Sequence, residues 1–341
     1  MKVITIGSAT LDVYVKSRAF KVLKSDKFLT GEGECLAVGS KNEAEEIFVD
    51  TGGGATNTAV TFANLGIPVS VLTRVGDDLF GREVERVMRE KKVGLEYLQK
   101  DGKNHTSYST LLLLGSGERA VLVHRGASNA LQFPKKQLKA DWFYITSLGG
   151  NVKLLGEILD YAKKNKIKVM YNPGGAELKN GLEKLKKYFE KLEVLNLNRE
   201  EAALLCKCDY KRMDVIKKSL SGIAPYVIVT DGPAGAYTIV DDKFYFASSL
   251  GTKPINTTGA GDAFGSGFCA GLILSAKGGS VAPRLPASGG GGKNDLDFAL
   301  RLAILNSDGI IRKMGAKSGI LKKLPAEKEM KKVKIKSELL N

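Results

Sequence analysis

Residues 256–264 read NTTGAGDAF, and they form the most informative stretch of this 341-residue sequence. The stretch separates a β-rich segment, residues 243–248, from an apolar helical segment, residues 263–275. Asp262, in the first turn of that helix, fits either an N-cap or a general base that takes a proton from a hydroxyl group attacking a phosphoryl group. Glycines at such a junction present backbone N–H groups to an anion, and the helix dipole adds to the attraction. The N–H groups concerned belong to Gly259, Ala260 and Gly261.

The same alternation of strand and helix runs along the chain. Short apolar runs predict buried strands at residues 2–7, 68–73, 142–146, 167–171, 194–197 and 226–230. Amphipathic patterns predict helices at residues 55–65, 80–91, 152–164, 181–191, 199–206 and 210–220. Strands that alternate with helices are typical of a mainly parallel sheet covered on both faces. The sequence therefore predicts an α/β fold.

Two regions break this alternation, residues 13–50 and residues 106–124. Both are β-rich and lack a helical pattern. In the second region a turn at residues 115–117 separates two strand-like runs, which is typical of a hairpin. We expect the two regions to form a small antiparallel β flap, or lid, at one edge of the main domain.

The C-terminal third contains a low-complexity segment. Residues 277–294 are rich in Gly, Pro and Ser, and they predict a flexible surface insertion ahead of a helix at residues 295–314. Residues 326–341 form a basic C-terminal tail. A single domain is therefore expected to span residues 1–325.

Composition excludes several classes of function. With 52 Lys and Arg against 37 Asp and Glu, the net charge is +15, but the lysines are spread without a nucleic-acid-binding motif. We expect a surface suited to anionic small molecules and no specific nucleic-acid partner. Two histidines and four scattered cysteines argue against a zinc site and a disulfide framework. Without a long apolar run or a signal peptide, a cytoplasmic protein with no membrane partner is expected.

A second glycine cluster, residues 52–54, opens the predicted helix at residues 55–65. Three consecutive glycines let a ligand approach the backbone closely, and a flexible loop is the alternative interpretation. Asn57 in this helix can both donate and accept hydrogen bonds. Asp12, just past the first strand, either accepts hydrogen bonds from two hydroxyl groups of a polyol or belongs to a turn.

Two further segments follow strands, where α/β sheets bind ligands. Asn198 and Glu201 could orient a hydrated Mg²⁺ ion, and their spacing also fits a helix capping box. Thr230, Gly232 and Gly235 lie in a turn whose glycines permit contact with nucleotide phosphates, although a plain hairpin explains the turn as well. The sequence has no P-loop motif and no protein-kinase motif set, which excludes both classes.

Together these motifs resemble the ribokinase-like (PfkB) carbohydrate kinase family across nearly the whole chain. Residues 52–57 look like its first signature, and residues 257–262 look like its second, which usually reads D-T-x-G-A-G-D. The resemblance implies a central, mostly parallel sheet with helices on both faces and a small β lid that closes over a sugar. The order of the segments between the signatures is also similar to that of the family: residues 74–78, 125–127, 198–201 and 230–235.

The resemblance implies an ATP-dependent, Mg²⁺-requiring kinase that phosphorylates a primary hydroxyl group of a sugar or nucleoside. Asp262 would be the general base, and the backbone N–H groups of Gly259, Ala260 and Gly261 would form the anion hole. Substrate hydroxyl groups would be held by Asp12, Gly53 and Asn57. Nucleotide and metal would be held by Asn198, Thr230, Gly232, Gly235 and, for Mg²⁺, Glu201.

The sequence departs from the family pattern at two places. Asn256 stands where the second signature usually begins with Asp, close to a site where some members bind a monovalent cation such as K⁺. Ribokinases usually have Lys within the first glycine cluster, whereas this chain has Ala55 and Thr56, as nucleoside and mixed-sugar members do. The rest of the cation region is similar at Gly315, Ala316 and Ser318. Lid strands in this family often pair between subunits, so the resemblance also implies a homodimer.

Other functions stay open at this level. The first is a kinase for an already phosphorylated sugar, of the 6-phosphofructokinase type, which a cluster of basic side chains under the lid would favour; the candidates are Lys16, Arg18 and Arg125. The second is a catalytically silent sugar- or nucleotide-binding regulator, against which the intact Gly-Ala-Gly-Asp argues. The third is an RNA-binding protein that uses the basic tail, whose binding would depend steeply on salt.

Overall fold

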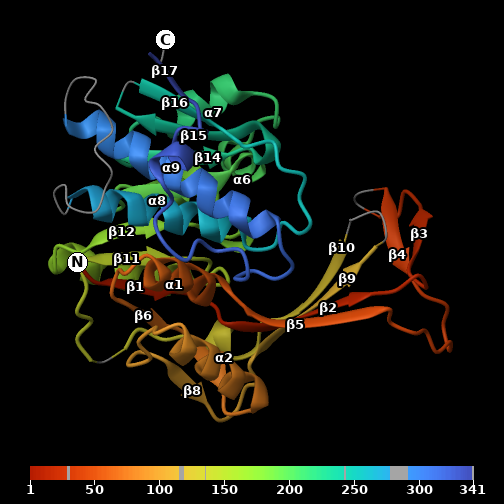
Figure 1. Cartoon of the computed structure of the whole chain (residues 1–341). Helices are drawn as coiled ribbons and strands as arrows, with labels where there is room; N and C mark the ends of the chain where they lie inside the picture. The colour runs from red at the N-terminus through yellow and green to blue at the C-terminus, as the bar shows by residue number, and fades with distance from the viewer. Residues whose placement is uncertain (29–30, 115–118, 135, 242, 277–290, 340–341) are drawn as a thin grey trace.

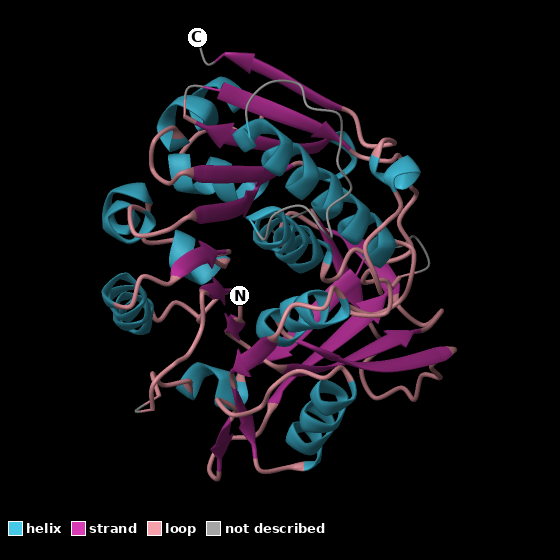
Figure 2. Ribbon diagram, turned by 60° about the vertical axis from the view of Figure 1, so that its left-hand side comes forward, coloured by secondary structure: helices cyan, strands magenta, loops and turns pink. Residues whose placement is uncertain are grey.

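The main sheet determines the architecture of the chain (Figures 1 and 2). The computed structural model describes residues 1–28, 31–114, 119–134, 136–241, 243–276 and 291–339. Within these residues, nine strands pair in the order β17-β16-β15-β14-β13-β12-β11-β1-β6. The strands from β14 to β6 run parallel, and β15, β16 and β17 are antiparallel additions at one edge. Their bounds are β1 Val3–Ile6, β6 Val69–Leu72, β11 Trp142–Ile145, β12 Lys168–Tyr171, β13 Val194–Asn198, β14 Tyr226–Thr230, β15 Gly235–Val240, β16 Lys243–Ser248 and β17 Ile335–Leu339.

Helices cover both faces of this sheet because the central strands are apolar on both sides. In β1, Val3 packs into one core and its neighbour Ile4 packs into the other, since successive side chains of a strand point to opposite faces. The first core includes α1 (Gly54–Asn64), α8 (Ala260–Ala276) and α9 (Gly291–Ile311). The second includes α3 (Val152–Lys164), α5 (Leu182–Phe189), α6 (Arg199–Cys206) and α7 (Met213–Leu220). The predicted α/β fold is confirmed.

A smaller layer lies beside the main sheet. Helix α2 (Leu79–Glu90) adds Val84 and Met88 to the first core. Its start is capped by Asp78, whose side chain accepts a hydrogen bond from the N–H group of Gly81 at 2.8 Å. The remaining short elements are β7 (Arg74–Gly76), which pairs with β8 (Gln99–Asp101), and the single-turn helices α4 (Gly175–Leu178) and α10 (Glu327–Met330).

The lid is a four-stranded sheet in the order β10-β9-β2-β5, which projects from the main domain as an arm in Figure 1. Its strands are β2 (Thr10–Lys16), β5 (Glu46–Gly52), β9 (Ser107–Leu113) and β10 (Arg119–His124). A hairpin of β3 (Lys21–Lys24) and β4 (Glu32–Cys35) lies at the far end of the arm. The expectation of a purely antiparallel flap was wrong, because β2 and β9 pair in parallel. Parallel pairing is possible because a long connection, which includes α1 and α2, returns the chain to the start of β9.

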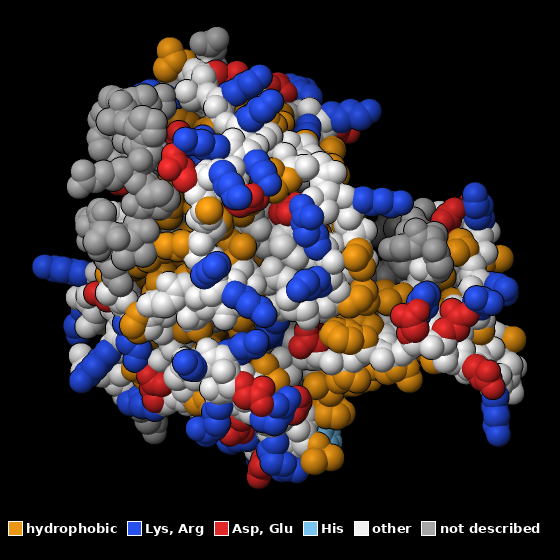
Figure 3. Space-filling view, viewed as in Figure 1, with side chains coloured by type: hydrophobic (Ala, Val, Ile, Leu, Met, Phe, Trp, Pro, Cys, Tyr) orange, Lys and Arg blue, Asp and Glu red, His pale blue; other side chains and the backbone are white. Residues whose placement is uncertain are grey.

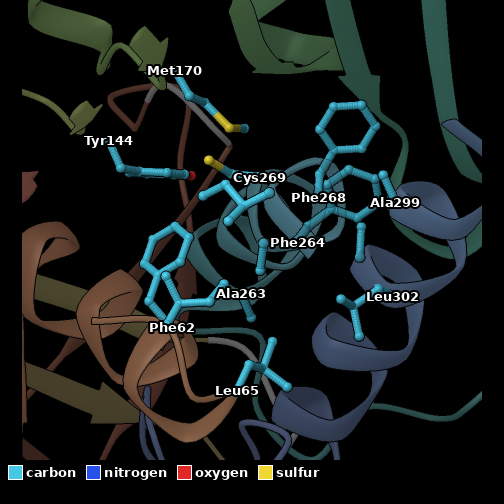
Figure 4. Packing of buried hydrophobic residues seen from close by; sticks show 14 of the residues in the cluster. Phe62, Leu65, Tyr144, Met170, Ala263, Phe264, Phe268, Cys269, Ala299 and Leu302 are labelled. Atoms are coloured by element: carbon cyan, nitrogen blue, oxygen red, sulfur yellow. The ribbon is translucent and has the colours of Figure 1, made fainter. Parts of the chain in front are cut away.

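Helix α8 lies between the sheet and α9, and this explains why most of its residues are apolar (Figure 4). Phe268 and Cys269 are fully buried. Glycine at position 271 allows the two helices to touch, since a Cβ atom there would lie 2.4 Å from the Cα atom of Ala299. A helix packed so tightly gives its first turn, which carries Asp262, a fixed place.

The C-terminal region differs from two expectations. Helix α9 begins at Gly291, ahead of the predicted start at residue 295, because packing of Leu296 and Ala299 in the core outweighs the poor helix propensity of glycine. Within the predicted basic tail, β17 pairs with β16 and extends the main sheet. Residues 277–290 of the predicted insertion and residues 115–117 of the predicted turn lie outside the described residues.

Cys35, Cys206, Cys208 and Cys269 are free thiols. Within the described part of the chain, none of the helices has both the length and the apolar character needed to cross a membrane.

Candidate active site

Asp262 lies at the centre of the predicted site. It stands in the first turn of α8, and its Oδ2 atom accepts a hydrogen bond from Nδ2 of Asn57 at 2.9 Å. The two residues come from the two glycine motifs, which are far apart in the sequence. Burial raises the pKa of Asp262 above its ordinary value of 3.8, the charge of Asp12 acts in the same direction, and the hydrogen bond from Asn57 and the charge of Lys317 oppose the rise. A carboxylate of this kind is suited to accept a proton.

The first glycine cluster is tightly enclosed by protein atoms. A Cβ atom on Gly53, whose φ is +93°, would lie 2.5 Å from the carbonyl oxygen of Ser8, and one on Gly54 would lie 2.5 Å from Oγ1 of Thr146. A Cβ atom on Gly52 would overlap the carboxylate of Asp12. The structure therefore gives a reason for these glycines that sequence reasoning missed: the chain passes directly against β2 and against the residues that follow β1 and β11. The cluster is not a flexible loop.

Asp12 belongs to the lid strand β2 and is buried, with 6% of its surface exposed. Its Oδ1 atom accepts a hydrogen bond from Oγ1 of Thr10 at 2.9 Å. Burial raises the pKa of Asp12, while the hydroxyl groups of Thr10 and Ser109 and the charge of Lys317 lower it. The strand register puts Asp12 opposite Ser109 on β9 and Asp50 on β5, so this face of the lid is polar where it meets the core.

Lys317 is a site residue that sequence reasoning missed. Its side chain is buried, and its Nζ atom donates to Oδ1 of Asn57 at 2.7 Å and to the carbonyl oxygen of Thr51. Burial lowers the pKa of Lys317 to about 8, against the opposing effect of nearby carboxylates. The sequence carries no distinctive signal for it, because residues 315–323 read GAKSGILKK and lysines are frequent there.

A cavity of about 460 Å³ lies at the N-terminus of α8. Ala260 and Gly261 line it at one end, and Phe264 of the same helix forms part of its wall. The turn predicted to contact a nucleotide lines it too, through Thr230, Gly232 and Gly235. The structure therefore brings these motifs together, while Asn198 does not line this cavity.

Gly259 and Ala260 shape the loop that precedes α8. Gly259 has a φ of +81°, and a Cβ atom on it would lie 2.9 Å from the carbonyl oxygen of Ala316. The N–H group of Ala260, assigned above to the anion hole, donates to the carbonyl oxygen of Thr257 at 3.2 Å. Gly259 and Gly261 are left as the better candidates for binding an anion.

Asn198 and Glu201 form a capping box at the start of α6. The N–H group of Glu201 donates to Oδ1 of Asn198 at 2.7 Å, and the N–H group of Asn198 donates to Oε2 of Glu201 at 2.9 Å. Burial raises the pKa of Glu201 to about 7, and the charges of Glu200, Asp262 and Glu177 add to the rise. The helix-start interpretation of this pair is confirmed.

A buried ion pair fixes the turn after β14. Nη1 of Arg199 donates to Oδ2 of Asp231 at 2.6 Å, and the hydroxyl group of Tyr210 donates to Oδ1 of the same carboxylate at 2.7 Å. The guanidinium group of Arg199 also stacks on the ring of Tyr210, 4.5 Å from its centroid. Sequence reasoning missed this network, which ties the start of α6 to the turn that lines the cavity.

The basic candidates under the lid do not form a cluster. Lys16 pairs with Glu46 at 2.6 Å and Arg18 pairs with Glu45 at 2.5 Å, both on exposed parts of the lid. Arg125 lines a small cavity together with Thr10 and Ser128. The positive charge of the lid is therefore largely balanced by its own glutamates.

Comparison with known proteins identifies the family of this chain. Residues 2–316 match the family described as pfkB family carbohydrate kinase. The chain belongs to the pfkB family of carbohydrate kinases. The prediction of a sugar or nucleoside kinase is confirmed at the level of this family.

Two curated relatives have low sequence identity to this chain. The probable chloroplastic fructokinase-6 of Arabidopsis thaliana is 24% identical over 233 residues, which cover 64% of this chain and 61% of that protein. The deoxyribokinase of Salmonella typhi is 25% identical over 243 residues, covering 68% and 76% of the two chains.

Solved structures share the fold over almost the full length. The nucleoside kinase of Methanocaldococcus jannaschii has a TM-score of 0.72 at 19% identity and covers 97% of both chains. The ribokinase of Giardia lamblia has a TM-score of 0.75 at 20% identity, with coverage of 97% and 98%. An Arabidopsis thaliana ribokinase in complex with ribose and ATP has a TM-score of 0.73 at 19% identity and covers 97% of both chains. The ribokinase-like fold is thereby confirmed.

Proposed function

We propose that this protein transfers the terminal phosphoryl group of ATP to a primary hydroxyl group of a sugar or nucleoside. One observation carries the proposal. Asp262 directly follows Ala260 and Gly261, which line the cavity, and it is hydrogen-bonded at 2.9 Å to the acceptor-side residue Asn57. A base in that position serves a hydroxyl group on one side and a phosphoryl group on the other. The related ribokinase that carries ribose and ATP supports both substrates.

The proton transfer falls to Asp262. Its carboxylate accepts the proton of the acceptor hydroxyl group as the hydroxyl oxygen bonds to the γ-phosphorus atom, while the bond from that phosphorus to the leaving oxygen of ADP breaks. The raised pKa of Asp262 makes it a better proton acceptor than an ordinary aspartate, because burial disfavours its charged form. The base must still be deprotonated to act, so the rate is expected to fall toward acid pH.

Charge on the transferred group would be stabilised at the N-terminus of α8. The N–H groups of Gly259 and Gly261 and the positive end of the helix dipole lie at this N-terminus, and Gly261 lines the cavity. Ala260 contributes less, since its N–H group donates to Thr257. The backbone supplies this stabilisation without a basic side chain.

Mg²⁺ would lie near Glu201, on whose carboxylate the charge of Asp262 acts. Glu201 offers a hard oxygen ligand there, and its raised pKa reflects burial and the surrounding carboxylates, which a bound cation would relieve. Within the described residues, no group of three or more His, Cys, Asp or Glu side chains could hold a metal by itself. The ion would therefore be held mainly by nucleotide phosphates and water, with Glu201 orienting it. When bound, it supplies neutralisation of phosphate charge.

The region expected to bind K⁺ is a poor fit for that ion. Oδ1 of Asn256 accepts a hydrogen bond from the N–H group of Thr258 at 3.1 Å, and Nδ2 of Asn256, a donor, is the atom left without a partner within the described part of the chain. The carboxylate of Asp50 lies against Gly315 in the same region, and its Oδ2 atom has no hydrogen-bond partner within the described residues, but the positive charge of Lys317 already acts on it there. We assign no step to a monovalent cation.

An unphosphorylated acceptor is the better supported substrate. A sugar phosphate would require basic side chains around its phosphate. Lys16 and Arg18 are paired with glutamates, however, and only Arg125 among the three candidates lines a cavity near Thr10.

The experiment that tests the proposed function is ATP consumption measured with ribose, fructose, 2-keto-3-deoxygluconate, adenosine, cytidine and fructose 6-phosphate. Turnover with fructose 6-phosphate alone would favour the phosphofructokinase type. Absence of turnover with every acceptor, despite ATP binding, would favour a silent regulator.

Asp12→Ala is expected to raise the KM for the acceptor about 100-fold with a smaller change in kcat, because a buried carboxylate that accepts acceptor hydroxyl hydrogen bonds is lost. Steady-state kinetics with the best acceptor of the panel measure this. Asp26→Ala, an exposed aspartate on the lid, serves as the control. An unchanged KM for Asp12→Ala would remove this residue from the acceptor site.

A homodimer through the lid is part of the proposal. Strand alternation puts Val13, Val15, Ile47, Val49 and Leu122 on the face of the lid opposite Asp12. Ile47 and Leu122 are each 65% exposed, and Figure 3 shows apolar side chains gathered over the arm. An apolar face of this kind on a projecting arm is typical of an interface.

Ile47→Lys is therefore expected to convert a dimer into a monomer, since a charge on this face would have to be buried without a partner. Light scattering coupled to size-exclusion chromatography measures the mass. Leu204→Lys, at an exposed leucine on α6, is the matched control and should leave the mass unchanged. A wild-type protein with the mass of one chain would contradict the proposal.

A further inference from the structure

Lys317 is buried, and burying a lysine destabilises the fold unless its ammonium group has partners. Only 6% of its surface is exposed, and lysine is almost never buried unless it is paired. Its Nζ atom donates to Oδ1 of Asn57 at 2.7 Å and to the carbonyl oxygen of Thr51. Both partners belong to the segment that carries the first glycine cluster, so the loop after α9 is tied directly to the acceptor side of the site.

The charges of three carboxylates act on this ammonium group. The charges of Asp50, Asp12 and Asp262 all favour its protonated form, against the effect of burial. In return, the charge of Lys317 favours the ionised forms of Asp12 and Asp262. The charge of Lys91, at the C-terminal end of α2, acts on Lys317 in the opposite direction. Without Lys317, the carboxylates of the acceptor site would repel the negatively charged phosphates of ATP more strongly.

The contact with Asn57 also has a direction. A lysine ammonium group has only donors, so the atom of Asn57 that faces it must be the carbonyl oxygen. The NH₂ group of Asn57 is thereby turned to the other side, where Nδ2 donates to Oδ2 of Asp262. If the amide were reversed, its oxygen would face the carboxylate of Asp262 and the two would repel. Lys317 therefore determines which way the Asn57 amide points.

We propose that Lys317 is a positioning residue for phosphoryl transfer, which acts through the amide of Asn57 to hold the carboxylate of Asp262 and balances the negative charge of the acceptor site. The inference rests on the proposed function, since it assumes that Asp262 is the base. It goes beyond it by assigning a side chain outside both glycine motifs to the control of that base.

The principal test is Lys317→Met, which keeps most of the side-chain volume and removes the charge. We expect kcat to fall about 100-fold with a much smaller change in the KM for ATP, because base geometry is lost while the nucleotide cavity is untouched. The acidic limb of the kcat/KM profile is expected to move to higher pH, since the positive charge that favours ionised Asp262 is gone. The assay uses the panel acceptor with the highest turnover. Lys313→Met, at an exposed lysine of the same loop, is the matched control and should change neither quantity.

A double-mutant cycle distinguishes a positioning role of Lys317 from a purely structural one. If Lys317 acts through Asn57, adding Lys317→Met to Asn57→Ala should lower kcat by less than about threefold, because the intermediary is already absent. Losses of kcat that multiply in the double variant, or a pH profile of Lys317→Met identical to that of the wild type, would overturn the proposal.

Circular dichroism and thermal melting identify variants that fail to fold. If Lys317→Met does not fold, Lys317→Arg, which keeps the charge and donors only, should retain more turnover than Lys317→Gln, and equal turnover of those two would overturn the proposal.

Failure of this inference is separable from failure of the proposed function. Normal turnover of Lys317→Met alongside an inactive Asp262→Asn would remove the role of Lys317 and leave the base in place. Normal turnover of Asp262→Asn would remove the base itself.

Discussion

Asp262→Asn is expected to lower kcat about 1,000-fold while ATP and acceptor still bind, because an amide cannot take a proton from the acceptor hydroxyl group. The substitution is isosteric. The oxygen of the new amide can still accept the hydrogen bond from Asn57 that the carboxylate accepts at 2.9 Å. The effect should therefore report on chemistry more than on architecture. Single-turnover kinetics and calorimetric titration with ATP measure the two quantities separately.

The pH dependence of wild-type activity is a second test of Asp262. Burial raises the pKa of Asp262 above its ordinary value of 3.8, so the base becomes protonated at a higher pH than a surface aspartate. We expect kcat/KM to fall as pH decreases through that raised pKa, and this limb should disappear in Asp262→Asn. Asp160→Asn, at an exposed aspartate on α3, is the control. Near-normal kcat in Asp262→Asn would exclude Asp262 as the base.

Gly259→Ala is expected to lower kcat about 100-fold, comparable to the loss of one anion-hole donor. Gly259 has a φ of +81°, a conformation that costs an L-residue about 1–2 kcal/mol. The new methyl carbon would also lie 2.9 Å from the carbonyl oxygen of Ala316. The loop must shift to relieve both effects, and its N–H groups would move away from the phosphoryl group.

The measurement for this variant is kcat together with the melting temperature. A loss of kcat that exceeds what partial unfolding explains supports the anion hole. Gly102→Ala is the matched control, because a Cβ atom there meets no neighbouring atom and no positive φ is involved. If Gly259→Ala melts earlier yet turns over normally when folded, the glycine serves packing and the anion hole lies elsewhere.

The layered fold was predictable because its signals are local. A buried parallel strand is apolar along its whole length, and a helix repeats its apolar positions every three or four residues, so residues 142–146 and 152–164 could be assigned from their own patterns. The junction before Asp262 was recognisable for the same reason, since a glycine with a positive φ ahead of a helix leaves its mark in the sequence itself.

The orientation of the lid strands could not be obtained in this way. Whether β2 and β9 run parallel or antiparallel depends on where the chain goes between them, and no local pattern records that path. The glycine cluster at positions 52–54 was recognisable in the sequence, but the packing that requires it was not. Its neighbours Ser8 and Thr146 are distant in the sequence, so the packing that requires glycine appears only in the folded chain.

The sequence by itself determined the fold class, the family and the position of the proposed base. Tertiary structure alone decided how that base is held. Asn57 and Asp262 are 205 positions apart, and Asn57 and Lys317 are 260 positions apart, yet the three side chains form one hydrogen-bonded chain. Periodicity and motif spacing act over a few residues, whereas an ammonium group finds its carboxylates only after the sheet has brought α1, α8 and the loop after α9 together.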